Sequence, residues 1–167
     1  MKRSILFLIL PLILALAGCA SQKEFNGLSL PFSSDEIEVI ELIHHTGDPL
    51  NAQQKWITDS EDINYIHKML SSDILLGSGS VDASAQTDTL YIKFCFYDGT
   101  GYTVKFESFG VKKGIITSND SPEITYFTKA DVCWIWGQLA KEYEAQAISI
   151  ADEPYATEIP VAIGYDS

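Results

Sequence analysis

The side chains with the most reactive chemistry in this 167-residue chain are three histidines and three cysteines. His44 and His45 are adjacent, so on a strand they point to opposite faces, and at most one of them can meet His67. Two ligands make a poor zinc site. The Ser-Gly repeat at 77–80 resembles neither a nucleophile elbow nor a phosphate-binding loop. We therefore expect no enzymatic activity, no cofactor and no metal site.

The amino terminus carries a targeting pattern that ends in a cysteine. Met1-Lys2-Arg3 is followed by an apolar run from Ile5 to Ala17, which is shorter than the about 20 residues of a membrane-spanning helix. A basic start before a short apolar run is typical of a signal peptide. Leu16-Ala17-Gly18-Cys19 resembles the lipobox of bacterial lipoproteins. The resemblance implies cleavage between Gly18 and Cys19 and attachment of diacylglycerol to the Cys19 thiol. Ordinary signal cleavage after Ala17 is the alternative.

Two or three acyl chains are enough for a stable membrane anchor. We thus expect a domain tethered to the cell membrane, outside the cytoplasm. Loss of Lys2 and Arg3 with the signal peptide changes the net charge from −12 to −14. Such a charge excludes a basic patch for nucleic acid. The expected partners are the membrane, through the lipid on Cys19, and a protein of the cell envelope.

The remaining sequence predicts one small domain. We expect a signal peptide at 1–18, a lipidated tether at 19–34, a domain at 35–146 and an acidic tail at 147–167. Hydrophobic patterns predict strands at 36–44, 55–57, 90–97, 102–109, 115–117 and 124–126, and a long loop at 71–88. Helices are predicted at 59–71, with a Thr58 capping box, and after 128–131. This order favours an α+β fold, an antiparallel sheet with two helices packed on one face.

A second resemblance lies inside the domain. Residues 55–59, Lys-Trp-Ile-Thr-Asp, lead into Asp62, Ile63 and Ile66, and Tyr91, Phe94 and Asp98-Gly99 follow. This pattern is similar to one in small Gram-positive lipoproteins, over roughly residues 36–145. The function of that family is itself unknown, so the resemblance implies a related fold and no catalytic residue.

The hairpin at 90–109 predicts an exposed face. Apolar pairing favours Phe96 opposite Tyr102, Phe94 opposite Val104 and Ile92 opposite Phe106, across a loop with an odd number of residues. The other face then carries Tyr91, Lys93, Lys105 and Glu107, with the two lysines directly opposed. The opposed lysines indicate either an anion contact or two side chains that splay into water. The same register places Cys95 and Cys133 on opposite sides of the sheet, so we expect no disulfide.

Trp134 is the other candidate for a binding surface. At 100° per residue it falls on the polar side of the last predicted helix, away from Val132, Trp136, Leu139 and Tyr143. Three alternatives stay open: the tail covers it, a partner binds it, since interfaces are enriched in tryptophan, or it is simply exposed. Two functions stay open. The first is a non-catalytic binding or accessory module, and the second is an inhibitor or immunity-type lipoprotein that blocks a basic protein.

Overall fold

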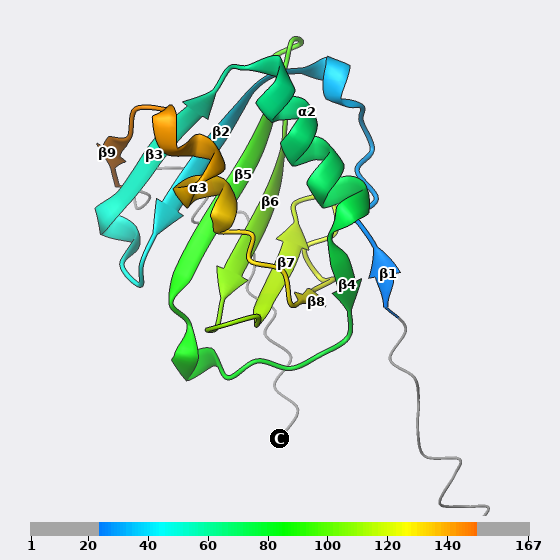
Figure 1. Cartoon of the computed structure of the whole chain (residues 1–167), viewed down its shortest axis with the longest axis vertical. Helices are drawn as coiled ribbons and strands as arrows, with labels where there is room; N and C mark the ends of the chain where they lie inside the picture. Colours follow the sequence, from blue (N-terminus) through cyan, green and yellow to red (C-terminus); the bar gives the residue numbers. More distant parts are fainter. Residues whose placement is uncertain (1–23, 150–167) are drawn as a thin grey trace, which may run out of the picture.

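The computed structural model describes residues 24–149, apart from the side chain of Ala83. The predicted signal peptide, Cys19 and tail residues 150–167 lie outside the described residues. A nine-stranded antiparallel sheet dominates the fold, in the order β1-β4-β8-β7-β6-β5-β2-β3-β9 (Figure 1). The strands are β1 Phe25–Asn26, β2 Ile37–His45, β3 Ala52–Ile57, β4 Leu75–Gly77, β5 Asp88–Phe96, β6 Gly101–Ser108, β7 Gly114–Ser118, β8 Tyr126–Thr128 and β9 Gln146–Ile148.

The first helix, α2, spans Ser60–Lys68 and is followed by a π turn at Met69–Asp73. Its N-cap is Asp59, whose carboxylate accepts hydrogen bonds from the backbone N–H groups of Glu61 and Asp62. The predicted Thr58 capping box is therefore wrong by one residue. A carboxylate also interacts more favourably than a hydroxyl with the positive end of the helix.

The second predicted helix is much shorter than the sequence suggested. The helix α3 spans Trp134–Gly137, and a 3-10 turn follows at Leu139–Glu142. Between them Gln138 leaves the helical region, at φ −120° and ψ −53°. The hydrophobic stripe is nevertheless present, since Val132 and Ile135 are buried and Trp136, Leu139 and Tyr143 pack against the core. A kinked chain buries the same residues as the predicted continuous helix would.

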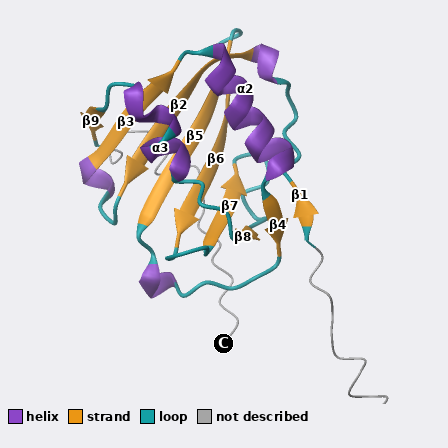
Figure 2. Ribbon diagram, viewed as in Figure 1, coloured by secondary structure: helices purple, strands orange, loops and turns teal. Residues whose placement is uncertain are grey.

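Alternation along the central strands separates an aliphatic face from a polar one. The aliphatic face carries the most deeply buried side chains of the sheet, including Ile40 and Leu42 of β2 and Ile92 and Phe94 of β5. They share one core cluster with Ile63 and Ile66 of α2 and with Ile135 of α3. Both helices are drawn in front of the sheet in the same view (Figure 2). Each fully buried aliphatic side chain of this kind contributes roughly 1.5–3 kcal/mol to stability.

The predicted hairpin faces are correct, but the register is not. Phe94 lies opposite Tyr102 and Ile92 opposite Val104, two residues away from the predicted pairing. The turn is tighter than expected, because Phe96 accepts a hydrogen bond from the backbone N–H of Gly99 and donates its own to Thr100. Gly99 has φ +82°, the left-handed conformation that a three-residue hairpin loop needs. Consequently Lys93 faces Thr103 and Lys105 faces Tyr91, and the two lysines are not directly opposed.

The predicted tether is also too long. Phe25–Asn26 pairs with β4, and Leu28 is buried with a backbone hydrogen bond to Leu70. Gly27 adopts φ +73°, where a Cβ would collide with the backbone of Ser71. The described domain therefore already includes residues 25–34, which the prediction assigned to the tether. At the other end, β9 includes Ala147 and Ile148, which the prediction assigned to the tail.

Candidate functional site: the polar face of the sheet

One face of the central strands carries the polar residues of this site. The register places Glu41 of β2 beside Lys93 of β5, and Tyr91 of β5 beside Lys105 of β6. We call this surface the polar face, defined by residues Glu41, His45, Thr89, Tyr91, Lys93, Thr103, Lys105, Glu107 and Thr117. Four of the predicted surface residues, Tyr91, Lys93, Lys105 and Glu107, thus lie together on it.

Four titratable side chains of the polar face are well buried. Exposed fractions are 4% for Glu41, 6% for Lys105, 5% for Glu107 and 8% for His45. Burying an ion is costly unless it is paired and hydrogen-bonded. A sheet face open to water would not bury such residues, so its burial needs a structural reason.

Ion pairs and amide hydrogen bonds compensate most of these charges. Lys105 Nζ lies 2.9 Å from Glu107 Oε1, which also accepts a 3.1 Å hydrogen bond from Gln86 Nε2. In the second pair, Lys93 Nζ lies 3.5 Å from Glu41 Oε2, and Gln54 Nε2 donates to the other Glu41 oxygen. The charges of these two lysines and two glutamates sum to zero, within a chain of strongly negative charge.

His45 is the exception. Among the described residues, its Nδ1 is a buried side-chain nitrogen with no hydrogen-bond partner. Its ring lies 6.3 Å from the ring of Tyr91. Burial, followed by the charges of His44 and Lys105, lowers the pKa of His45 from its ordinary value. The imidazole is therefore neutral at pH 7, and its Nδ1 offers one unused donor or acceptor site inside the polar face.

The thiol and the phenol of this side of the sheet lose a proton less readily than they do in water. Burial, the largest cause, raises the pKa of the Cys95 thiol and of the Tyr91 phenol. A cysteine with a raised pKa is a poor nucleophile. Cys95 and Cys133 are both free, as the face assignment predicted. Burial, with smaller contributions from the charges of Asp88 and Asp131, raises the pKa of the Cys133 thiol to about 12.

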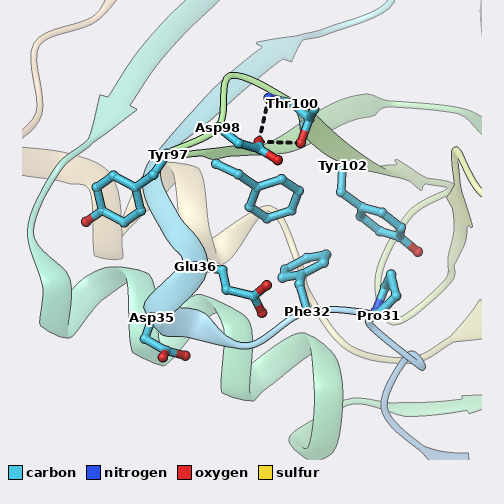
Figure 3. A pocket seen from close by; sticks show the side chains of 10 residues that line it. Pro31, Phe32, Asp35, Glu36, Tyr97, Asp98, Thr100 and Tyr102 are labelled. Atoms are coloured by element: carbon cyan, nitrogen blue, oxygen red, sulfur yellow. Dashed lines mark hydrogen bonds between the residues drawn. The ribbon is translucent and has the colours of Figure 1, made fainter.

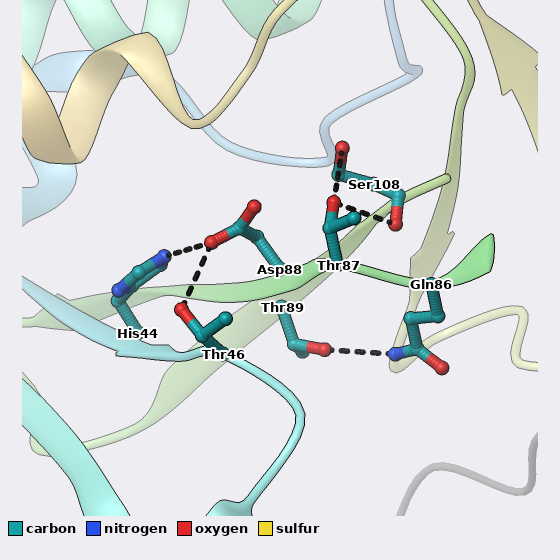
Figure 4. A network of polar contacts seen from close by, with 7 residues as sticks. All are labelled: His44, Thr46, Gln86, Thr87, Asp88, Thr89 and Ser108. Carbon is teal, nitrogen blue, oxygen red and sulfur yellow. Dashed lines mark hydrogen bonds and ion pairs between the residues drawn. The ribbon is translucent and has the colours of Figure 1, made fainter. Parts of the chain in front are cut away.

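A second polar network lies where the carboxy-terminal end of β2 meets the amino-terminal end of β5. His44 Nε2 is 3.0 Å from Asp88 Oδ1, which also accepts a 3.1 Å hydrogen bond from Thr46 (Figure 4). The His44 ring stacks on the ring of Trp136, with 5.2 Å between the two centroids. This contact packs α3 against strand β2. His44 and His45 do point to opposite faces. His67 lies elsewhere, 3.0 Å from the carbonyl oxygen of Phe32.

Trp134 does not join the polar face. It is 41% exposed on α3, and its ring lies 5.9 Å from that of Tyr65 on α2, which is also exposed. The predicted binding surface therefore splits into two separate places.

Within residues 24–149 we find no cluster of three metal-ligating side chains. None of the described helices has the length and apolar character needed to span a bilayer.

A cavity of about 530 Å³ lies between residues 31–36, which precede β2, and the turn that joins β5 to β6. Its floor is Phe32, whose ring centroid is 4.8 Å from that of Phe96 and 5.1 Å from that of Tyr102. Figure 3 shows Phe32 between Glu36 and Tyr102. Asp35 and Asp98 lie at its rim, and hydrogen bonds from Ser33 and from Thr100, respectively, lower their pKa values. The sequence missed this pocket because Phe32 was assigned to the tether.

Sequence reasoning also missed Glu41 and His45. The observed β2 contains a register irregularity between Ile37 and Val39, which shifts the alternation along the strand. Only after this bulge do Ile40 and Leu42 face the core and Glu41 the opposite side. The sequence signal for Glu41 was a single charged residue between two aliphatic residues.

The chain matches no known protein family, no curated protein and no solved structure.

Proposed function

We propose that the protein is a lipid-anchored bacterial lipoprotein whose domain binds a protein of the cell envelope without catalysing a reaction. The lipobox resemblance of residues 16–19 supports the anchor. Because β1 starts at Phe25, the linker of residues 20–24 reaches about 17 Å at ~3.3 Å per residue. The domain is thus expected close to the bilayer, with the β1 edge of the sheet nearest to the membrane.

Fatty-acid labelling tests the anchor. Cells grown with a clickable fatty acid should label the wild-type protein and leave the Cys19→Ala variant unlabelled. Cys95→Ala is the matched control, because Cys95 is a free thiol in the folded domain and its loss should not change the label. Equal labelling of wild type and Cys19→Ala would contradict the proposal.

The polar face supports a binding role. The observation that carries this part is the buried His45 Nδ1 without a partner, beside the Lys105–Glu107 ion pair. An unmet hydrogen-bonding group inside a packed polar layer costs stability, and buried polar groups of folded proteins almost always have a partner. The missing partner of His45 Nδ1 thus supports a second molecule at this face. We take the two helices to cover the aliphatic face, as the sequence predicted, which leaves the polar face for recognition.

In-cell photo-cross-linking tests the location. A photoreactive residue at Lys93 should give an adduct with a second protein, whereas the same residue at the exposed Tyr65 of α2 should not. An intermolecular adduct from position 65 alone would move the binding surface to the helices. It would also favour the Tyr65–Trp134 pair as the docking point.

The inhibitor function has one observation in its favour. The pocket at Phe32 combines aromatic walls with carboxylates at its rim, which suits an ammonium or guanidinium group of a basic partner. Calorimetric titration with an oligolysine peptide would test it. Tyr97→Ala and Asp35→Asn should each weaken binding several-fold, and the affinity should fall with salt. Unchanged binding in both variants would exclude the pocket.

A further inference from the structure

We infer that the chain's own carboxy-terminal segment, residues 150–167, packs across the polar face of the sheet. This inference deepens the proposed function and rests on the same face: the segment covers the polar face in the free protein, and an envelope protein that binds there displaces it. It does not depend on the lipid anchor. It starts from the burial of Glu41, His45, Lys105 and Glu107. Among the described residues no helix belongs to this side, since the buried residues of α2 and α3 join the aliphatic cluster.

The path of the chain leads to this face. Strand β9 pairs with β3, with Ile148 opposite Ala52. Ile148 packs against a second, smaller cluster formed by Ile43, Ala52 and Tyr91, which belongs to the polar side of the sheet. The described chain thus reaches residue 149 at the margin of the polar face, on the strand beyond β3.

The segment is long enough to cover it. Residues 150–167 span about 59 Å when extended, at ~3.3 Å per residue. From β9 to β6 there are four strand spacings, about 19 Å in total at ~4.8 Å each. Even a folded-back path would therefore reach Lys105 and Glu107.

The composition of the segment also fits. It contains the apolar run Ile159-Pro160-Val161-Ala162-Ile163, and Pro154 and Pro160 disfavour a helix or a central strand. Its charged side chains are all acidic: Asp152, Glu153, Glu158 and Asp166. Most of this acidic protein would repel such a segment. The polar face does not, because Lys93 and Lys105 balance its two glutamates.

A crossing chain would also satisfy His45. Its Nδ1 needs one donor or acceptor, and a passing backbone N–H or C=O supplies either. Cover of Trp134 by the tail was one of the alternatives left by the sequence, and it stays a prediction because residues 150–167 lie outside the described residues. Glu41, His45, Lys105 and Glu107 are at most 8% exposed, whereas Trp134 is 41% exposed.

Two cysteines of the chain make the test possible. Cys95 lies on the polar-face side of β5, and Cys133 precedes α3 on the opposite side. Alkylation rates of both are measured by peptide mass spectrometry, in the full chain and in a chain that ends at Ser149. Removal of residues 150–167 should speed alkylation of Cys95 at least several-fold and leave the Cys133 rate unchanged. The NMR titration of His45 should move upward toward its ordinary value near 6.5.

A length-preserving variant, Ile159→Ser/Val161→Ser/Ile163→Ser, separates loss of docking from loss of folding. If truncation also speeds the alkylation of Cys133, the shortened domain has opened. The alkylation rate of Cys95 in the triple-serine variant then decides. Unchanged Cys95 alkylation and His45 titration would overturn the inference. So would protection of Cys95 that appears only at high protein concentration, which would identify a second copy as the cover. Protection that needs membranes would overturn it too, and would identify another partner.

Discussion

Removing one partner of the Lys105–Glu107 ion pair should destabilise the domain far more than a surface salt bridge would predict. Both side chains are 7% exposed, and their charged atoms lie 2.9 Å apart. Glu107→Gln leaves the Lys105 ammonium buried without its counter-ion. Breaking a buried pair in this way costs about 3–5 kcal/mol. We therefore expect Glu107→Gln to lower the free energy of unfolding by about 3–5 kcal/mol.

The assay is urea denaturation of a double-mutant cycle. Glu107→Leu and Lys105→Met should each cost several kcal/mol, as Glu107→Gln does, whereas the double variant Lys105→Met/Glu107→Leu should recover much of the loss, because no charge is left buried. The matched control is Lys141–Glu142, a 3.7 Å pair whose side chains are 62% and 84% exposed. Its Glu142→Gln variant should cost at most about 1 kcal/mol.

The comparison between the two pairs refutes or supports the burial of the polar face in solution. If Glu107→Gln costs no more than Glu142→Gln, the face is hydrated and the reasoning is wrong. A large loss in Glu107→Gln that the double variant does not recover would assign the effect to packing or to the Gln86 hydrogen bond instead of the ion pair.

Three further predictions concern single residues. The pKa of His45 is lowered in the folded state, so the unfolded state binds its proton more tightly. Stability should therefore be full above pH 6.5 and fall below it, and His45→Gln should weaken this acid sensitivity in unfolding measurements. The same acid sensitivity in His45→Gln and in the wild type would contradict this assignment. Because the Cys133 pKa is raised to about 12, iodoacetamide at pH 8 should modify Cys133 far more slowly in the native protein than in urea, and comparable rates would contradict its burial. Phe32→Ala should lower the unfolding free energy by about 2 kcal/mol, since Phe32 contacts Phe94, Phe96 and Tyr102; a loss below about 0.5 kcal/mol would return Phe32 to the tether.

The sequence was most informative where local patterns decide the structure. Alternation assigned Phe94 and Lys93 to opposite faces, and the structure agrees because each strand buries one side. The antiparallel sheet itself was predicted from the order of strands and helices along the chain. The register failed because it depends on the turn: Gly99 in the left-handed region closes a shorter loop than apolar pairing alone suggested.

Long-range contacts account for the other errors. Nothing local to Leu28 shows that it is buried, because its backbone partner Leu70 lies far along the chain. The same holds for Phe32, which becomes a core residue only once β5 and β6 come together. The last helix was overestimated because a hydrophobic stripe survives a kink at Gln138 as well as a straight helix does. The polar face was half visible, since Glu41 and His45 join it only after the bulge in β2.

The most direct measurement of the central claim is the mass of the amino-terminal peptide of the protein extracted from its native membrane. We expect a peptide that begins at Cys19 and carries a diacylglyceryl group, with or without a further acyl chain. An unmodified peptide that begins at Gly18 would instead show ordinary signal cleavage after Ala17, and would contradict the lipid anchor.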